Sequence, residues 1–124
     1  MAVVRTLPNK PPETKIVYQN VESVGALLGA KGKPVLRKVL GLIRDAAYYR
    51  NWPLVRLEIA HVEDKEIENW RYVLIVLVFS RDFEAADGYL HNFYERLDSL
   101  AQVLDSEEQD ILRRKLFFDI AAAV

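Results

Sequence analysis

The sequence contains no cysteine among its 124 residues. A chain without thiols forms no disulfide, binds no metal through thiolates and has no cysteine nucleophile. This composition is typical of a reducing compartment, and residues 1–8 lack the sustained apolar core of a signal peptide. We therefore expect a cytoplasmic protein.

Long hydrophobic runs are also missing. The longest uninterrupted apolar run is Tyr72–Phe79, which is far shorter than the roughly 20 residues that cross a bilayer as a helix. We therefore expect no contact with a membrane.

The formal net charge is only −1, but the first half of the chain has few acidic residues and the second half has fewer basic than acidic residues. Residues 1–50 contain nine Lys or Arg against three Asp or Glu, and residues 51–124 contain eight against fifteen. The two halves therefore carry net charges of +6 and −7. Such halves attract each other within one fold or between subunits, and the basic half could also bind an acidic partner.

The apolar run Tyr72–Phe79 is the clearest signal of structure. Four of its residues are β-branched, namely Val73, Ile75, Val76 and Val78. The run predicts a strand over residues 70–80 that is buried on both faces, with helices or a partner over it.

A second strand is predicted just before it. Residues 54–62 alternate partly between apolar and polar side chains, and the polar loop 63–69 leads into the central strand. The two strands should form an antiparallel hairpin. Residues 14–19 predict a possible edge strand, and the prolines of residues 1–13 predict an extended arm without a core of its own.

Four helices are predicted. The first covers about 21–29 after an Asn20 N-cap, and the second covers about 34–49 with Pro34 in its first turn. The third, about 83–104 with Asp82 as N-cap, has apolar residues at alternating spacings of three and four. A capping box formed by Ser106 and Gln109 would begin the fourth, about 107–122, whose apolar arc is too wide for one buried side.

Together these elements predict an α+β domain over residues 14–124 that follows an arm over residues 1–13. Apart from the possible edge strand, the two predicted strands leave an open sheet edge, and we do not expect one small sheet to bury the third and fourth helices together with the apolar face of the second. A twofold homodimer would cover both surfaces. The alternative is a monomer in which the helices bury one another on the sheet.

The basic residues near the start of the second helix form the first candidate site. Gly29–Lys33 resembles an anion-binding turn before a helix, although Leu27 and Pro34 rule out a Walker A loop. The wider set could contact nucleic-acid backbone, with Tyr48, Tyr49 and Trp52 stacking on bases. The candidate anion- or nucleic-acid-binding residues are Lys31, Lys33, Arg37, Lys38 and Arg44. The alternative is a solvated face on a core helix.

Two acidic groups also contain a histidine. Asp87, His91 and Glu95 recur every four residues, so they would share one helical face as a possible acid–base or metal cluster. The second group could collect a hard cation in the hairpin loop, although its spacing does not match an EF-hand. It comprises His61, Glu63, Asp64, Glu66 and Glu68. Surface ion pairs and a solvated loop are the simpler alternatives, and we expect no metal site and no cofactor.

The sequence therefore favours an interaction or regulatory module that works as a homo-oligomer over an enzyme. Its support is the surplus of apolar surface and the opposite charges of the two halves. The alternative function is binding of nucleic acid or a phosphate ligand through the basic N-terminal half.

Overall fold

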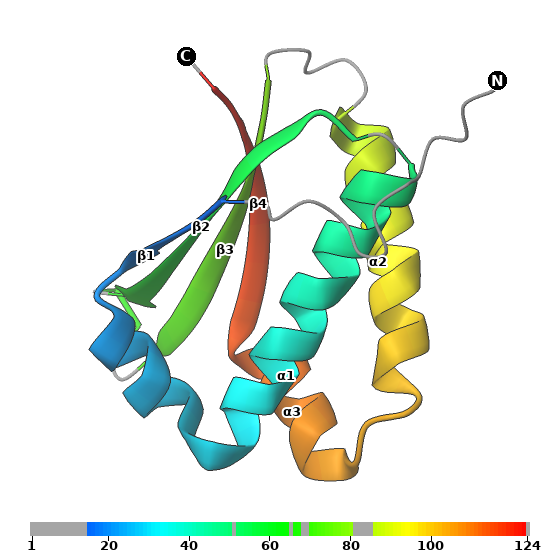
Figure 1. Cartoon of the computed structure of the whole chain (residues 1–124). Helices are drawn as coiled ribbons and strands as arrows, with labels where there is room; N and C mark the ends of the chain where they lie inside the picture. The colour runs from blue at the N-terminus through cyan, green and yellow to red at the C-terminus, as the bar shows by residue number, and fades with distance from the viewer. Residues whose placement is uncertain (1–14, 51, 65, 68–69, 81–85, 124) are drawn as a thin grey trace, which may run out of the picture.

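The computed structural model describes residues 15–50, 52–64, 66–67, 70–80 and 86–123, and in this part the chain is an α+β domain. A four-stranded mixed sheet carries three helices (Figure 1). The predicted arm, residues 1–13, lies outside the described residues. The elements in chain order are β1 (Lys15–Gln19), α1 (Val21–Tyr49), β2 (Leu54–Glu63), β3 (Arg71–Phe79), α2 (Ala86–Ala101), α3 (Ser106–Arg114) and β4 (Leu116–Ala122).

The strands lie side by side in the order β1-β2-β3-β4. The predicted antiparallel hairpin is confirmed as β2 and β3, and the predicted edge strand is confirmed as β1. β1 runs parallel to β2, and β4 runs parallel to β3. The chain therefore contains two strand–helix–strand units, β1-α1-β2 and β3-α2-α3-β4, joined by the central hairpin.

The prediction of a fourth helix over 107–122 is wrong in its second half. Helix α3 ends at Arg114, and β4 pairs with β3 along its whole length. The predicted helix had apolar residues around too much of its circumference because part of it is a strand. Side chains alternate between the two faces of a strand, so Phe117 and Phe118 point in opposite directions. β4 occupies the sheet edge beside β3 that the prediction had left open.

The first two predicted helices are a single element, α1, bent at Gly29. This glycine has φ 70° and ψ −171°, while Lys31, Gly32 and Lys33 are helical, so the predicted interruption shrinks to one residue. The bend divides α1 into two segments, 21–28 and 30–49, which form an elbow (Figure 1). Pro34 lies inside the second segment near its start, where it removes one backbone donor.

The elbow can be tested through two glycines of α1. Gly29→Ala should lower the free energy of unfolding by about 1–3 kcal/mol, because its backbone conformation is essentially restricted to glycine. Gly41→Ala should raise it by about 0.5–1 kcal/mol, because Gly41 is helical and a Cβ there meets nothing within 4 Å. Urea titration of both variants measures the difference, and equal effects would contradict the bent geometry.

The third predicted helix is observed as α2, which ends at Ala101 rather than at residue 104. The predicted start of the third helix, with Asp82 as N-cap, lies outside the described residues. The capping box of α3 is formed by Asp105 and Glu108 rather than by Ser106 and Gln109. Asp105 Oδ1 accepts from the Glu108 backbone N–H at 2.8 Å, whereas the Gln109 amide donates to the carbonyls of Ala101 and Leu104.

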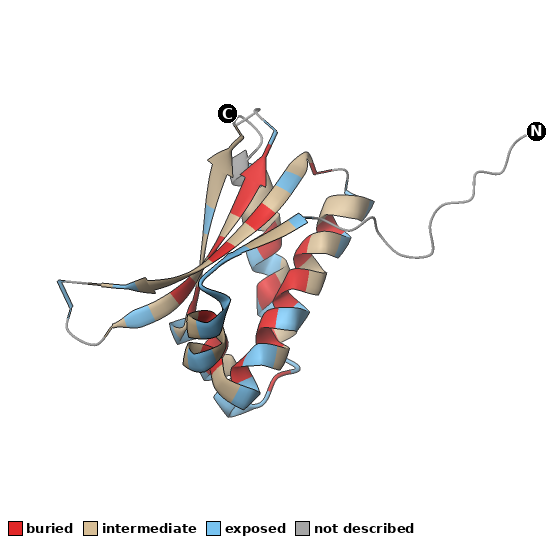
Figure 2. Cartoon of the chain, turned by 60° about the vertical axis from the view of Figure 1, so that its left-hand side comes forward, coloured by how far each residue is buried: buried red, intermediate tan, exposed pale blue. Residues whose placement is uncertain are grey.

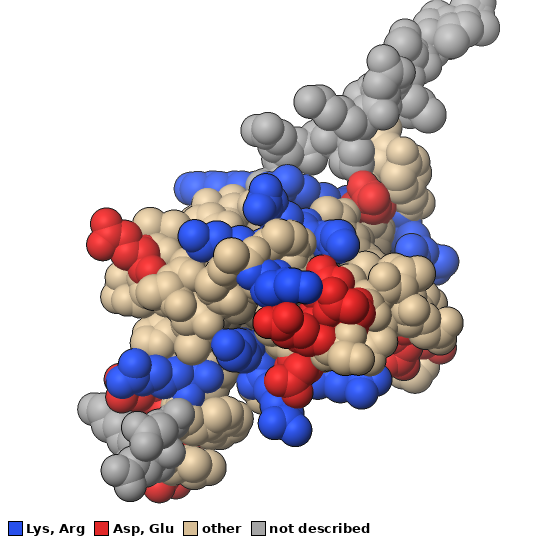
Figure 3. All heavy atoms as spheres, turned by 90° about the horizontal axis from the view of Figure 1, so that it is seen from below, with Lys and Arg blue, Asp and Glu red and all other residues tan. Residues whose placement is uncertain are grey.

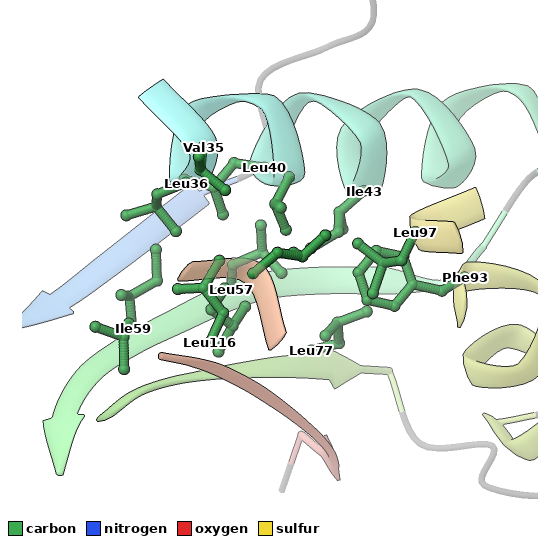
Figure 4. Packing of buried hydrophobic residues seen from close by; sticks show 14 of the residues in the cluster. Val35, Leu36, Leu40, Ile43, Leu57, Ile59, Leu77, Phe93, Leu97 and Leu116 are labelled. Carbon is green, nitrogen blue, oxygen red and sulfur yellow. The ribbon is translucent and has the colours of Figure 1, made fainter. Parts of the chain in front are cut away.

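One hydrophobic core lies between the sheet and the helices. Val35, Leu36, Leu40 and Ile43 of α1 point down onto the sheet, and Phe93 and Leu97 of α2 extend the same layer (Figure 4). The most deeply buried strand residues, all 0% exposed, are Leu57, Ile59, Val73, Ile75 and Leu77.

All three helices pack against the same face of the sheet (Figure 1), and the buried residues gather between these two layers (Figure 2). The hairpin end of β2 and β3 extends beyond the helices (Figure 2). Within the described part of the chain, none of the helices is both long enough and apolar enough to cross a membrane.

Candidate functional site

The sheet face turned away from the helices, called here the outer face, carries mostly apolar side chains. Strand alternation and the pairing register place every second residue on it. Most of these side chains are half-buried rather than exposed. Its apolar residues are Val17 of β1, Ala60 and Val62 of β2, Tyr72, Leu74, Val76 and Val78 of β3, and Phe117 and Ala121 of β4.

An aromatic cluster lies at the hairpin end of the outer face. The ring centroids of Trp70 and Tyr72 are 4.9 Å apart, those of Tyr72 and Phe117 are 4.9 Å apart, and those of Trp70 and Phe117 are 5.7 Å apart. All three side chains are half-buried. Large aromatic groups that retain exposed surface supply much of the binding energy at protein interfaces.

Charged residues of the outer face lie toward its other end. Arg56 Nε donates to Glu58 Oε2 at 2.7 Å, so this pair is neutral as a unit. Lys15 of β1 and Asp119 of β4 lie on opposite edges of the sheet and are exposed. Asp119 Oδ1 also accepts a hydrogen bond from the Ile120 backbone N–H at 2.8 Å.

The central strand thus meets the prediction fully on one face and only in part on the other. Val73, Ile75, Leu77 and Phe79 are buried beneath the helices, as expected for a strand that is apolar on both faces. On the outer face Tyr72, Leu74 and Val76 remain half-buried, whereas Val78 is buried at 1% exposed. The sequence signal for this surface was the unbroken apolar run itself, but the run could not show which face carries the helices.

The predicted basic set is divided by the fold. Lys31 Nζ lies 3.0 Å from Asp105 Oδ2 and 3.7 Å from Glu107 Oε2, and Lys38 Nζ lies 4.0 Å from Glu108 Oε2. Figure 3 shows acidic side chains gathered among lysines and arginines at this end of the molecule. The basic half of the chain therefore meets the acidic half within one fold.

The ion pair of Lys31 is reflected in two pKa shifts. The hydrogen bond to Asp105 raises the pKa of Lys31 above its ordinary value. The Glu108 backbone N–H, followed by Lys31, lowers the pKa of the Asp105 carboxyl. Both side chains are about half exposed, so the pair contributes little to stability.

The other three basic residues are differently placed. Lys33 and Arg37 are exposed and line a pocket inside the elbow of α1. Arg44 lies about two turns further along, and its Nε is buried without a hydrogen-bond partner in the described part of the chain. Trp52, predicted to stack on bases, is instead 7% exposed and packs against Phe79 and Tyr89. Nucleic-acid binding by the remaining residues stays a prediction.

Within the described residues, the members of the two acidic groups make separate contacts. His91 Nε2 lies 3.4 Å from Glu95 Oε1 on an exposed face of α2, while the side chain of Asp87 is outside the described part. In the hairpin loop, Asp64 Oδ1 accepts from the backbone N–H groups of Glu66 and Ile67.

Glu63 pairs with Arg71, and Glu68 lies outside the described residues. Among the residues that the structure describes, no group of three His, Asp or Glu could hold a metal ion.

Comparison with known proteins adds no further constraint. No protein-family model, curated protein or solved structure matches the chain.

Proposed function

We propose that this protein is a non-catalytic interaction module that works as a homodimer, with the outer face of the sheet as the contact surface. The observation that carries the proposal is the apolar outer face itself, with its cluster of Trp70, Tyr72 and Phe117. Packing two such faces about 10 Å apart would form a sandwich with a dry centre.

The charges of this face support a second copy as the partner. Arg56 and Glu58 neutralise each other within one chain, so they require no counter-charge from outside. A twofold axis parallel to the strands would place β1 of one copy over β4 of the other. Lys15 and Asp119, which lie about two residues apart in register, would then approach each other across the interface.

The two edges of the sheet are protected, so a dimer should form through the outer face and not by pairing of edge strands. Asp119 places a charge on the edge strand β4 and its carboxylate accepts from the adjacent Ile120 N–H. β1, at the other edge, has only five residues and is exposed at both of its ends. Short edge strands and charged edge residues are common protections against edge-to-edge pairing.

The area of the outer face sets the expected affinity of the dimer. Four strands about 4.8 Å apart and nine residues at about 3.3 Å each give a footprint of at most about 600 Å². A standard interface buries about 800 Å² per partner. We therefore expect a dimer that dissociates on dilution.

The test is sedimentation velocity over a range of protein concentrations, with the wild type and two variants. The wild type should shift from monomer to dimer as concentration rises. Leu74→Asp should remain a monomer with an unchanged far-UV circular dichroism spectrum, because it places a charge at the centre of the outer face.

The matched control is Val103→Asp. Val103 is 78% exposed and lies beyond the end of α2, remote from the outer face, so this variant should dimerise like the wild type. A wild type that stays monomeric, or a Leu74→Asp variant that still dimerises, would exclude the proposal.

A further inference from the structure

The bend at Gly29 creates a pocket between the two segments of α1. The pocket has a volume of about 630 Å³, within the range of small-molecule sites. Tyr18, near the end of β1, also lines the pocket. Its remaining lining residues are Val21, Glu22, Val24, Gly25, Ala26 and Leu28 of the first segment and Lys33, Leu36 and Arg37 of the second.

The lining combines apolar walls with two cations. Val24, Leu28 and Leu36 are buried core residues that form part of the walls. Lys33 and Arg37 lie one turn apart on the second segment, and no ion-pair partner of either is found in the described part of the chain. These two cations outnumber the one acidic side chain in the lining, that of Glu22.

Gly25 makes room for one of the cations. A Cβ at this position would lie 3.3 Å from Lys33 Cε and 3.8 Å from Lys33 Nζ. The lysine side chain therefore crosses the elbow and holds its ammonium against the first segment. The N-terminus of α1 is on the same side, where Asn20 makes no side-chain capping bond and the Val21 and Glu22 amides add positive potential.

We propose that this pocket binds a small amphipathic anion, with its acidic head group on Lys33 and Arg37 and its apolar body against Val24, Leu28 and Leu36. Two cations beside apolar walls match a ligand that has both parts. Inorganic phosphate would use the cations alone and leave the walls wet. A long polyanion would gain little from a concave apolar lining.

The experiment uses decanoate as the probe, titrated by calorimetry and followed by amide chemical shifts in the full chain. Decanoate should bind, with shifts centred on residues 21–28 and 33–37. The double variant Lys33→Met/Arg37→Met, which keeps long apolar side chains but removes both charges, should weaken binding at least tenfold. Glu22→Gln should strengthen decanoate binding, because it removes from the pocket a negative charge that repels the anion.

Lys38→Met is the matched control. Lys38 is on the same turn of the helix as Arg37 but does not line the pocket, so decanoate affinity should be unchanged. Ala26→Phe, at an exposed helical position in the lining, should fill the pocket and abolish binding while the fold is retained.

Several outcomes would overturn the proposal. They are no binding of decanoate, equal binding of decylammonium, equal binding of inorganic phosphate, or shifts centred on the outer face rather than on the elbow. The first three do not bear on the dimer, because the pocket and the outer face lie on opposite sides of the sheet, and the Leu74→Asp variant should bind decanoate normally.

Discussion

Ile75→Asp should yield a protein that does not fold. Ile75 is 0% exposed in the central strand β3, and its sheet neighbours are Ile59 of β2 and Phe118 of β4. No water reaches an aspartate there, and burying a carboxyl group without a partner costs several kcal/mol in addition to the lost packing. This sum approaches the roughly 5–15 kcal/mol that stabilises a whole domain.

The neighbouring position provides the control. Leu74→Asp changes the same strand by the same chemistry, but Leu74 lies on the outer face and is half-buried. Its expected effect is loss of the dimer with the fold retained. Circular dichroism and the cooperativity of urea unfolding distinguish the two variants. A cooperatively folding Ile75→Asp protein would show that β3 is not the centre of the core.

The central hairpin could be predicted from sequence because its signals are local and agree with one another. An unbroken β-branched run, an alternating run before it and a polar loop between them leave few other structures. The predicted ranges 54–62 and 70–80 differ from Leu54–Glu63 and Arg71–Phe79 by one residue at each shifted end.

The end of the chain could not be predicted because its local signals conflict. The capping box and the charges of 105–114 favour a helix, and no glycine or proline separates that helix from the mostly apolar residues 116–122. What makes residues 116–122 a strand is the open edge of β3, a tertiary partner that lies 43 positions earlier at Val73↔Leu116. Sequence periodicity does not show such a partner.

The candidate sites could be predicted only in part, because they too depend on contacts between distant parts of the chain. The basic residues were found as a group, yet only the fold shows that Lys31 and Lys38 pair with α3 while Lys33 and Arg37 face a pocket. The outer face depends on which side the helices occupy. This is decided by the connections between strands and not by any one strand.

Phe93→Ala should cause the largest loss of stability among single truncations that still allow folding, about 3–5 kcal/mol. Phe93 is 0% exposed and has the largest volume of the fully buried side chains in the described part of the chain. Its ring lies 4.9 Å from that of Phe118 in an edge-to-face contact, so it joins α2 to β4. Truncation leaves a cavity between helix and sheet and removes this aromatic contact.

The adjacent residue, Tyr94, tests whether the loss of stability comes from core packing or from the removal of any aromatic ring. Tyr94 is 43% exposed and its ring lies 6.3 Å from Phe118, so Tyr94→Ala should cost less than about 1 kcal/mol. Phe93→Leu should lie between the two, because leucine fills part of the cavity. Urea titrations at one temperature give all three differences. If Tyr94→Ala cost as much as Phe93→Ala, α2 would have to pack on the sheet through a different face than the one that buries Phe93.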